Sequence, residues 1–481
     1  ITNQIDQYKI AVLALLSQEE PLTSSGTNII QTIEDFIFAT LWHATLSHHS
    51  KDSKNCGDVV IELAKTIYDL GPDHFSDNGI PASSSVVAGW TYATPLLSCF
   101  QFQSALIHLA NAGGNKGLTI ATHIALAIVG SGGVIEDYGN TDTNEEQSSS
   151  TGDNNKTYVS SNDILGHFLV MHASNLQEVS PQAALEYLVR IPDDKFSDGQ
   201  QIVPIGSKRR VGKKAKSQIA RLICKTREFA TLAGHISPDG DRNSSNAALD
   251  KYLSPLEVSD VLATAAKEMQ YNGSLTDAAE LFVLAGRFGS LISLFNQELS
   301  QLLVITEQDN DDIKQKRKFW YDAAINFHST YLSQGRTHVV QMLEKEGNTW
   351  IGHAFQMILN LMVFFDRCYG KMWESAWEFI DQLDLFPKTD AELSIKVESF
   401  QRLNINIKEV FPNVIINSIQ SLYEQYFSLK GEIGANSSTI RQRLNELKTS
   451  VRLIVTYSGL IDLNLSADAK SRISQMEAYM V

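Results

Sequence analysis

Apolar residues recur every three or four positions along most of the chain, which is the period of an amphipathic helix. The segment 102–112 places Phe102, Leu106 and Leu109 on one helical face, and the segment 118–128 repeats the same spacing. The strict alternation of apolar and polar residues that is typical of a half-buried strand is nearly absent. The pattern therefore predicts an all-α protein, with roughly 60–75% of its residues in helices against the usual third.

Glycines lie between these two segments, in the stretch LANAGGNKGLTIATHIALAIVGSGG from Leu109 to Gly133. A phosphate-binding loop of the Walker type needs a glycine, four residues and then Gly-Lys-Ser/Thr, fed by an apolar strand. Here Lys116 precedes Gly117 and a helical pattern precedes the glycines, so both the order and the context differ. Glycines between two amphipathic segments instead indicate a helix C-cap and an elbow. We therefore predict a helical hairpin at this position.

Three sites carry the local signals of a helix start. Ser254-Pro255-Leu256-Glu257 and Thr389-Asp390-Ala391-Glu392 are capping boxes, in which the hydroxyl and the carboxylate bond each other's backbone N–H groups. Ser180-Pro181 offers an N-cap followed by proline at the first helical position. Each site predicts a helix that begins at the residue after the Ser or Thr.

The most apolar stretch is IGHAFQMILNLMVFF, residues 351–365. It is shorter than the about 20 apolar residues that span a bilayer, so we expect no transmembrane segment. Its apolar side chains cover nearly the whole helical circumference, which predicts a buried helix with neighbours on every side. At the end of the chain, Ile473, Met476 and Met480 share one face and predict a helix that caps the core.

A loose pattern of an alanine followed by large apolar residues recurs as SALIHLANAG, AALEYLVRI, DAAELFVLAG and SAWEFIDQL. The copies are roughly eighty to a hundred residues apart and irregular, unlike an array with a fixed repeat length. Small residues let one helix approach its partner, and large ones fill the groove between them. We therefore expect residues 1–481 to form one α-helical solenoid of stacked pairs, truncated at its N-terminus because the chain begins inside a helical pattern.

Two polar segments interrupt this pattern. Residues 136–157, EDYGNTDTNEEQSSSTGDNNKT, lack the apolar residues that could pack, and are predicted to form a disordered surface loop. Residues 205–216 are predicted to form a basic loop that includes KRRVGKKAK. This run is a nuclear-import signal or an anchor for phosphate-rich partners, or else a solvated loop leading into the helix SQIARLICKT. The candidate interaction residues are Lys208, Arg209, Arg210, Lys213, Lys214 and Lys216.

The composition excludes several classes of function. A net charge of −15 argues against nucleic-acid or anionic-membrane binding by the chain as a whole, and no aromatic residue is interleaved in the basic run to stack on bases. Specific nucleic-acid binding is therefore not expected. The four cysteines lie far apart without a CxxC pair, which excludes a cysteine-rich zinc site and suits a reducing compartment.

No constellation of residues suggests a catalytic, metal or cofactor site. The segment that begins at Asp239 has acidic or amide residues at the first, third and fifth positions of a calcium loop, but Ser244 replaces the required glycine and Asp250 the required glutamate. It is predicted to be a turn. His167 and His172 are five residues apart, which places them on different helix faces. We expect no enzyme and no cofactor.

Five segments together resemble the C-terminal solenoid of the nucleoporin-interacting-component family, the linker scaffold nucleoporins of the nuclear pore inner ring (the ninety-three-kilodalton class). The resemblance runs from about Ile29 to Val481, and its order and spacing make it specific although the single motifs are packing residues. The segments are FQFQSALIHLANAG, TREFATLAGHISPDGDR, GSLTDAAELFVLAGRFGSLISLFNQELS, FFDRCYGKMWESAWEFIDQLDLFP and RLIVTYSGLIDLNLSADAKSRISQMEAYMV.

The resemblance implies an elongated, fold-back α-solenoid related to coat-protein scaffolds, and a structural role in the nuclear pore complex at the nuclear envelope. It implies that the solenoid receives a linear segment of a smaller, membrane-associated inner-ring nucleoporin. Channel nucleoporins and large ring scaffolds would bind a more N-terminal region that is absent here. The segments 136–157 and 208–216 look like lineage-specific insertions, and the peptide groove is not located. A vesicle-coat or tethering solenoid, and a hydrolase or nucleotide-binding enzyme, are the alternatives.

Overall fold

The computed structural model describes residues 9, 12–13, 32–47, 56–75, 86–138, 161–193, 211–237, 242–304, 310–332, 337–345, 349–431, 438–461, 463 and 466–480. Of these residues, 81% are helical, against the 60–75% expected of the whole chain. The described strands are β1 (His235–Ile236) and β2 (Arg242–Asn243), which pair with each other. The prediction of an all-α fold is confirmed. The aspartates of the calcium-like segment, at 239 and 241, lie outside the described residues.

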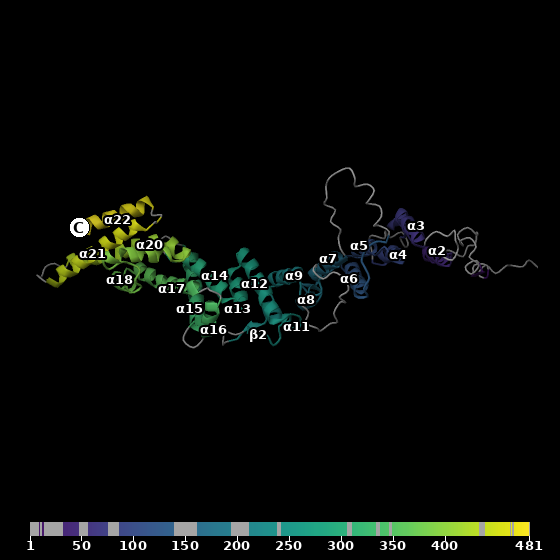
Figure 1. Ribbon diagram of the computed structural model, residues 1–481, viewed down its shortest axis with the longest axis horizontal. Helices are drawn as coiled ribbons and strands as arrows, with labels where there is room; N and C mark the ends of the chain where they lie inside the picture. Colours follow the sequence, from purple (N-terminus) through teal and green to yellow (C-terminus); the bar gives the residue numbers. More distant parts are fainter. Residues whose placement is uncertain are drawn as a thin grey trace, which may run out of the picture. The chain divides into compact units, whose positions relative to one another are not determined.

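The chain divides into two compact units. Unit 1 comprises residues 1–235 and 244–269 and is a row of helices, in which α2 packs on α3, α4 on α5, and so on through α9 (Figure 1). Its elements are α2 (Ile33–Ser47), α3 (Cys56–Leu70), the 3₁₀ helix η1 (Pro72–Phe75), α4 (Val86–Ser98), α5 (Phe102–Ala112), α6 (Gly114–Gly130), α7 (Ser161–Leu176), α8 (Pro181–Leu188), α9 (Lys213–Thr226), α10 (Phe229–Leu232), α11 (Leu249–Tyr252) and most of α12 (Pro255–Tyr271).

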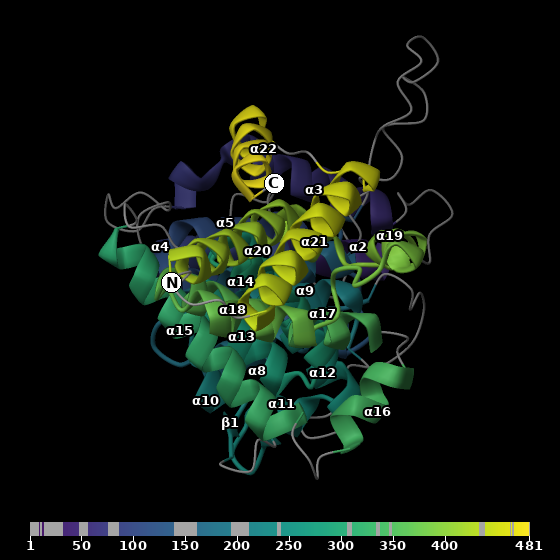
Figure 2. The same ribbon diagram turned by 90° about the vertical axis from the view of Figure 1, so that its left-hand side faces the viewer.

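Unit 2 comprises residues 236–243 and 270–481. Here helices distant in sequence also pack together: α14 contacts α17 and α20, and α20 contacts α22, so the chain folds back on itself (Figure 2). Its elements are α13 (Leu275–Leu284), α14 (Phe288–Gln301), α15 (Asp311–Phe327), the π-helical turn η2 (His328–Leu332), α16 (Thr337–Lys345), α17 (Thr349–Tyr369), α18 (Trp373–Gln382), the 3₁₀ helix η3 (Asp390–Glu392), α19 (Leu393–Gln401), α20 (Ile405–Gly431), α21 (Ser438–Leu460) and α22 (Ala467–Met480).

The glycine-rich stretch is a helical hairpin, as predicted. Helix α5 ends at Ala112 with Gly113 as its C-cap, and α6 begins at Gly114, whose φ of +53° is a conformation that favours glycine. One residue between two helices forces the chain to reverse, and α5 and α6 pack against each other. Gly117 lies at their closest approach, because an added Cβ there would overlap the carbonyl oxygen of Leu109. The glycines therefore shape a bend and a contact.

The predicted helix starts are confirmed at two of three sites. The Ser180 side chain accepts a hydrogen bond from the N–H of Ala183, and α8 begins at Pro181. Ser254 and Glu257 form the reciprocal bonds of a capping box at the start of α12. At the third site a 3₁₀ turn runs into α19, and the Glu392 carboxylate accepts from the N–H of Lys388 instead of Thr389.

The recurring alanines are packing residues. The four that precede the large apolar side chains in α5, α8, α13 and α18 have no exposed surface: Ala105, Ala184, Ala278 and Ala376. Helix α17 is buried against α14, α16, α18 and α20, although His353 and Gln356 remain exposed on one stripe, so its neighbours do not surround it completely.

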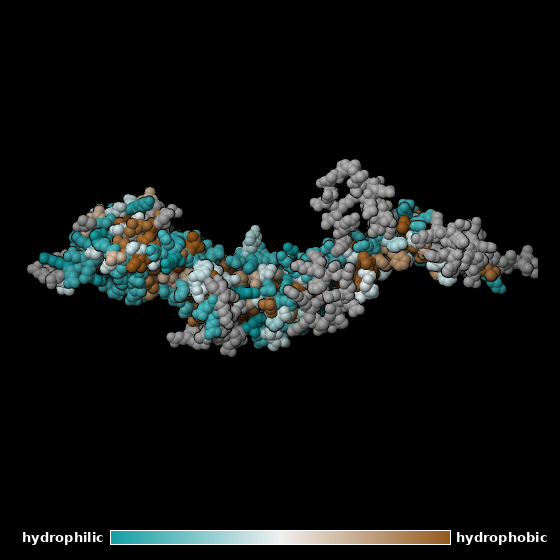
Figure 3. Space-filling model, in the orientation of Figure 1, coloured by the Kyte–Doolittle hydropathy of each residue, from teal (hydrophilic) through white to brown (hydrophobic). Residues whose placement is uncertain are grey.

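The last helix of the chain, α22, packs against two other helices. Ile473, Met476 and Met480 of α22 are buried, as predicted, and α22 packs on α20 and α21. Hydrophobic residues also gather on the visible surface where α20 and α22 lie (Figure 3).

The first three residues of the polar segment 136–157 form a loop with a defined place on the fold. The carboxylate of Asp137 accepts hydrogen bonds from the N–H and the hydroxyl of Ser104, at 3.1 Å and 2.5 Å. Gln101 donates to the carbonyl of Tyr138 at 3.0 Å, so residues 136–138 pack against the start of α5. The prediction of disorder is wrong for these three residues, because the Asp137 carboxylate and the Tyr138 backbone bond residues at the start of α5, and the Glu136 carboxylate accepts from Ser161. Residues 139–157 lie outside the described residues.

Candidate interaction groove

A groove runs between α7 and α9 in unit 1. Two cavities, of about 750 Å³ and about 450 Å³, share Val170, Gln218 and Arg221 in their linings, and therefore adjoin each other. The larger cavity reaches the segment after α8, at residues 191–193, and the smaller one reaches α12 at Glu268. A groove of this kind between stacked helices can hold an extended chain.

The α7 wall combines small side chains with polar ones, the latter being Asn162, Asp163, His167 and Gln177. Gly166, Val170, Ala173 and Ser174 fall on one face of the helix, at spacings of four, three and one residues. The Ser174 hydroxyl donates to the carbonyl of Val170 at 2.9 Å within the helix, so it is already satisfied. The small side chains therefore form an apolar strip on α7, bordered by polar side chains of the same helix.

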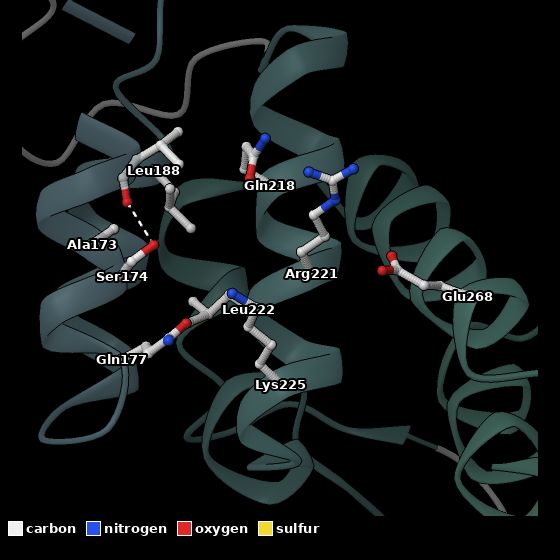
Figure 4. Close-up of a pocket in the computed structure, with 10 residues that line it drawn as sticks. Ala173, Ser174, Gln177, Leu188, Gln218, Arg221, Leu222, Lys225 and Glu268 are labelled. Atoms are coloured by element: carbon white, nitrogen blue, oxygen red, sulfur yellow. Dashed lines mark hydrogen bonds between the residues drawn. The ribbon is translucent and has the colours of Figure 1, made fainter. Parts of the chain in front are cut away.

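The α9 wall is cationic. Lys213–Thr226 contains five basic residues and no acidic one. Figure 4 shows Gln218, Arg221 and Lys225 on this helix, with Ser174 and Gln177 of α7 on one side and Glu268 of α12 on the other. Leu188 and Leu222 are buried and form the apolar floor.

The structure divides the basic run that the sequence singled out. Lys213, Lys214 and Lys216 lie in the first turn and a half of α9, so this part is helix rather than the predicted loop. Lys214 pairs with Asp163 of α7 at 2.8 Å, and Lys216 lies 3.8 Å from both Glu257 and Asp260 of α12. Lys208, Arg209 and Arg210 lie outside the described residues.

Lysines at a helix N-terminus oppose the helix dipole, which favours anions there. Carboxylates from other elements offset the unfavourable interaction of these lysines with the helix dipole. Asp163 and Glu257 pair with the lysines, and the Asp193 side chain lies so close to Gly212, the N-cap of α9, that an added Cβ would fall 2.7 Å from its Cγ. Two of the lysines therefore stabilise the packing of α9 between α7 and α12.

The remaining cations face solvent. Lys213, Arg221 and Lys225 are exposed and line the groove, and none of them forms an ion pair or side-chain hydrogen bond with another described residue. Sequence reasoning missed Arg221 and Lys225 because they are not clustered. The available signal was their spacing, since Lys214, Gln218, Arg221 and Lys225 fall at i, i+4, i+7 and i+11 on one helical stripe.

The two histidines of α7 lie on different faces, as predicted. His167 lines the groove, whereas His172 is buried with its ring edge-on to Tyr187 of α8, at 4.5 Å between ring centroids. Within the described ranges no three His, Cys, Asp or Glu side chains are grouped as metal ligands.

A membrane-spanning helix needs length as well as apolar character. None of the helices in the described part of the chain combines the two sufficiently to cross a bilayer.

Comparisons with known proteins agree on one family. The family model described as Nup93/Nic96 matches residues 1–472. The nuclear pore complex protein Nup93 of Danio rerio is 22% identical over 485 residues, covering 100% of this chain and 54% of that protein. Nucleoporin NIC96 of Saccharomyces cerevisiae is 24% identical over 329 residues, covering 65% of this chain and 36% of that protein. The chain thus spans about half the length of the Danio rerio relative.

A solved structure shares the fold. The crystal structure of Chaetomium thermophilum Nic96 SOL superposes with a TM-score of 0.55 at 17% identity, covering 99% of this chain and 68% of that one. The α-solenoid fold predicted from the sequence is thereby confirmed. Neither the family model nor these relatives support the vesicle-coat alternative.

Proposed function

Because the chain belongs to the Nup93/Nic96 family, we propose that it is a structural scaffold of the nuclear pore complex, which holds other nucleoporins at the nuclear envelope and so supports nucleocytoplasmic transport. The observation that carries the proposal is the family match over residues 1–472. Several relatives at similar identity are named nuclear pore complex proteins. The role is structural and non-catalytic.

The fold supports this role physically. Buried alanines let helices approach closely, and each unit consists of helices whose apolar stripes are covered by neighbours. Such an array stays rigid while it exposes grooves between helices, which is what a scaffold needs in order to hold flexible segments in place.

The finer proposal is that this solenoid binds an extended or short helical segment of a smaller, membrane-associated inner-ring nucleoporin. A segment that orders on binding loses conformational entropy, so a few buried contacts must supply its affinity. Contacts with channel nucleoporins and large ring scaffolds would involve a region N-terminal to this chain. The groove between α7 and α9 is a candidate place for such a segment.

Localisation tests the scaffold role. The full-length protein, tagged in its own cells, should form a nuclear rim and copurify with other nucleoporins. A distribution on cytoplasmic vesicles would overturn the proposal in favour of a coat or tether.

A binding titration tests the peptide role. The purified chain is mixed with peptides tiled across the smaller inner-ring nucleoporins, and the heat of binding is measured. At least one peptide should bind at about ten micromolar or tighter, which corresponds to about −7 kcal/mol. If none binds, the solenoid acts through contacts between folded surfaces.

A further inference from the structure

Three cations in the groove between α7 and α9 form no ion pair with a described residue. Lys214 and Lys216 are paired with carboxylates, but Lys213, Arg221 and Lys225 are exposed and unpaired among the described residues. Three carboxylates line the same cavities: Asp163 pairs with Lys214, whereas Asp193 and Glu268 form no ion pair with a described residue. The lining therefore carries four cations against three carboxylates.

This surface differs from the chain as a whole, whose net charge is −15. A local row of cations in an acidic protein attracts negative groups and repels positive ones, which selects a partner by charge. We propose that the groove binds an acidic, extended peptide segment of another protein, with its carboxylates on Lys213, Arg221 and Lys225. This inference rests on the proposed scaffold function and names the chemistry of one partner.

The dimensions of the groove fix the length of the segment. Lys213 and Lys225 are twelve residues apart on α9, which is about 18 Å at 1.5 Å per residue. An extended chain rises about 3.4 Å per residue, so five or six residues span this distance. Alternate side chains of such a segment point in opposite directions, so acidic residues can face α9 while apolar ones enter the floor.

The rest of the lining suits a peptide. Val170 is half-buried and offers apolar surface to a ligand, and the buried Leu188 and Leu222 lie beneath it. The amides of Gln177 and Gln218 bond no other described residue, so they are available to the backbone of a ligand. No Phe, Tyr or Trp lines either cavity, so the groove lacks the stacking surface by which nucleic-acid bases are held.

The test uses the whole 481-residue chain and fluorescein-labelled hexapeptides, with binding measured by fluorescence anisotropy. The probe alternates glutamate with leucine, and the matched probe alternates glutamine with leucine. We expect the glutamate probe to bind at least about tenfold more tightly, with the difference shrinking as salt screens the charges. Equal binding of the two probes would overturn the proposal.

Charge reversal locates the site. The double variant Arg221→Glu/Lys225→Glu should weaken binding of the glutamate probe at least about tenfold and should bind a lysine–leucine probe instead. The control Lys251→Glu/Lys267→Glu makes the same change of charge at exposed lysines outside the groove, and should bind like the unmodified chain. Unchanged binding by the groove variant, or equal loss in the control, would refute the assignment.

A second variant guards against misfolding of the charge-reversed protein. In Gly166→Trp the new side chain enters the groove from the α7 wall, where an added Cβ has only an ordinary contact of 3.6 Å with Ile191. It should abolish probe binding without changing charge, and retained binding would contradict the site.

An oligodeoxythymidine of equal charge tests specificity. It should not compete with the glutamate probe, and competition at equal concentration would replace the proposal by general polyanion binding. If no acidic probe binds while the tagged protein still forms a nuclear rim, this inference alone falls and the scaffold function stands.

Discussion

The carboxylate of Glu257 accepts a hydrogen bond from the backbone N–H of Val211 across 3.0 Å, and so ties the first turn of α12 to the residue that precedes the N-cap of α9. The same carboxylate accepts from the N–H and the hydroxyl of Ser254, at 3.1 Å and 2.8 Å. Burial alone would raise the pKa of Glu257, but the bonds from Ser254 and Val211 and the charge of Lys216 lower it below its ordinary value.

Glu257→Gln should therefore lower the free energy of unfolding by about 1–3 kcal/mol at neutral pH, because an amide turns an N–H donor toward a backbone N–H. A carboxylate whose pKa is lowered by folding stabilises the protein above its unfolded pKa, near 4.5, and loses this effect as the pH falls below it. Urea titrations at pH 7 and near pH 3.5 give the free energy of unfolding of the variant and of the unmodified chain. The difference between the two should be smaller at the lower pH.

The control for this prediction is Glu178→Gln, which removes an exposed carboxylate in the same unit. It should change stability by less than about 0.5 kcal/mol. A Glu257→Gln variant as stable as this control at pH 7 would mean that the hydrogen bonds contribute nothing net.

The Glu257 site also shows how far sequence reasoning reaches. Ser254 and Glu257 are three residues apart, and the capping box that they form was predicted because the chemistry of a helix start is local. Val211 is 46 residues away, and no local rule connects it with Glu257. At Thr389 the same motif failed, because Glu392 found a different backbone N–H at Lys388.

The groove lay beyond prediction for the same reason. The all-α fold, the hairpin at Gly113 and the family could be predicted, since periodicity, glycine chemistry and the order of segments are properties of the chain itself. The six clustered cations were visible, but their division into structural pairs and free charges depends on where Asp163 and Glu257 lie in space. Arg221 lines the groove only because α7 lies beside α9 in the folded chain.

Acid should destabilise unit 1 through His172. This side chain is 4% exposed, and its Nδ1 has no hydrogen-bond partner among the described residues. Burial, and secondarily the nearby His123, lower the pKa of His172 below its ordinary value of 6.5. The unfolded chain takes up a proton at that value and the folded chain does not, so stability is lost as the pH falls below 6.5.

The check is the pH dependence of thermal unfolding between about pH 7.5 and 5.5, the range in which histidine titrates. His172→Phe keeps an aromatic ring against Tyr187 and should make the melting temperature depend less steeply on pH. Some dependence should remain, because burial also lowers the pKa of His108. His167→Gln, at an exposed site on the same helix, is the matched control. An unaltered slope in His172→Phe would assign the acid sensitivity to other groups.

Gly117→Ala should destabilise the α5–α6 hairpin. The added Cβ would overlap the Leu109 carbonyl oxygen, and a backbone atom cannot rotate away as a side chain can. Overpacking of this kind costs about 1–3 kcal/mol. Gly459→Ala, in α21, meets nothing within 4 Å and should instead stabilise by about 0.5–1 kcal/mol, as alanine does within a helix. Thermal melts of the two variants should therefore shift in opposite directions, and a shared direction would contradict the close approach at Gly117.

Removal of residues 467–481 should lower the stability of unit 2, because α22 covers apolar faces of α20 and α21 that would then meet water. Its buried side chains, Ile473 and Met476 among them, are 4% and 7% exposed, and truncating one such side chain to alanine costs about 2–5 kcal/mol. Ile473→Ala should reproduce part of the loss by itself. Tyr479→Ala lies on the same helix but is 58% exposed, so it should leave the melting temperature nearly unchanged. If the truncated chain melted like the intact one, α22 would be a surface appendage, and the core of unit 2 would end at α21.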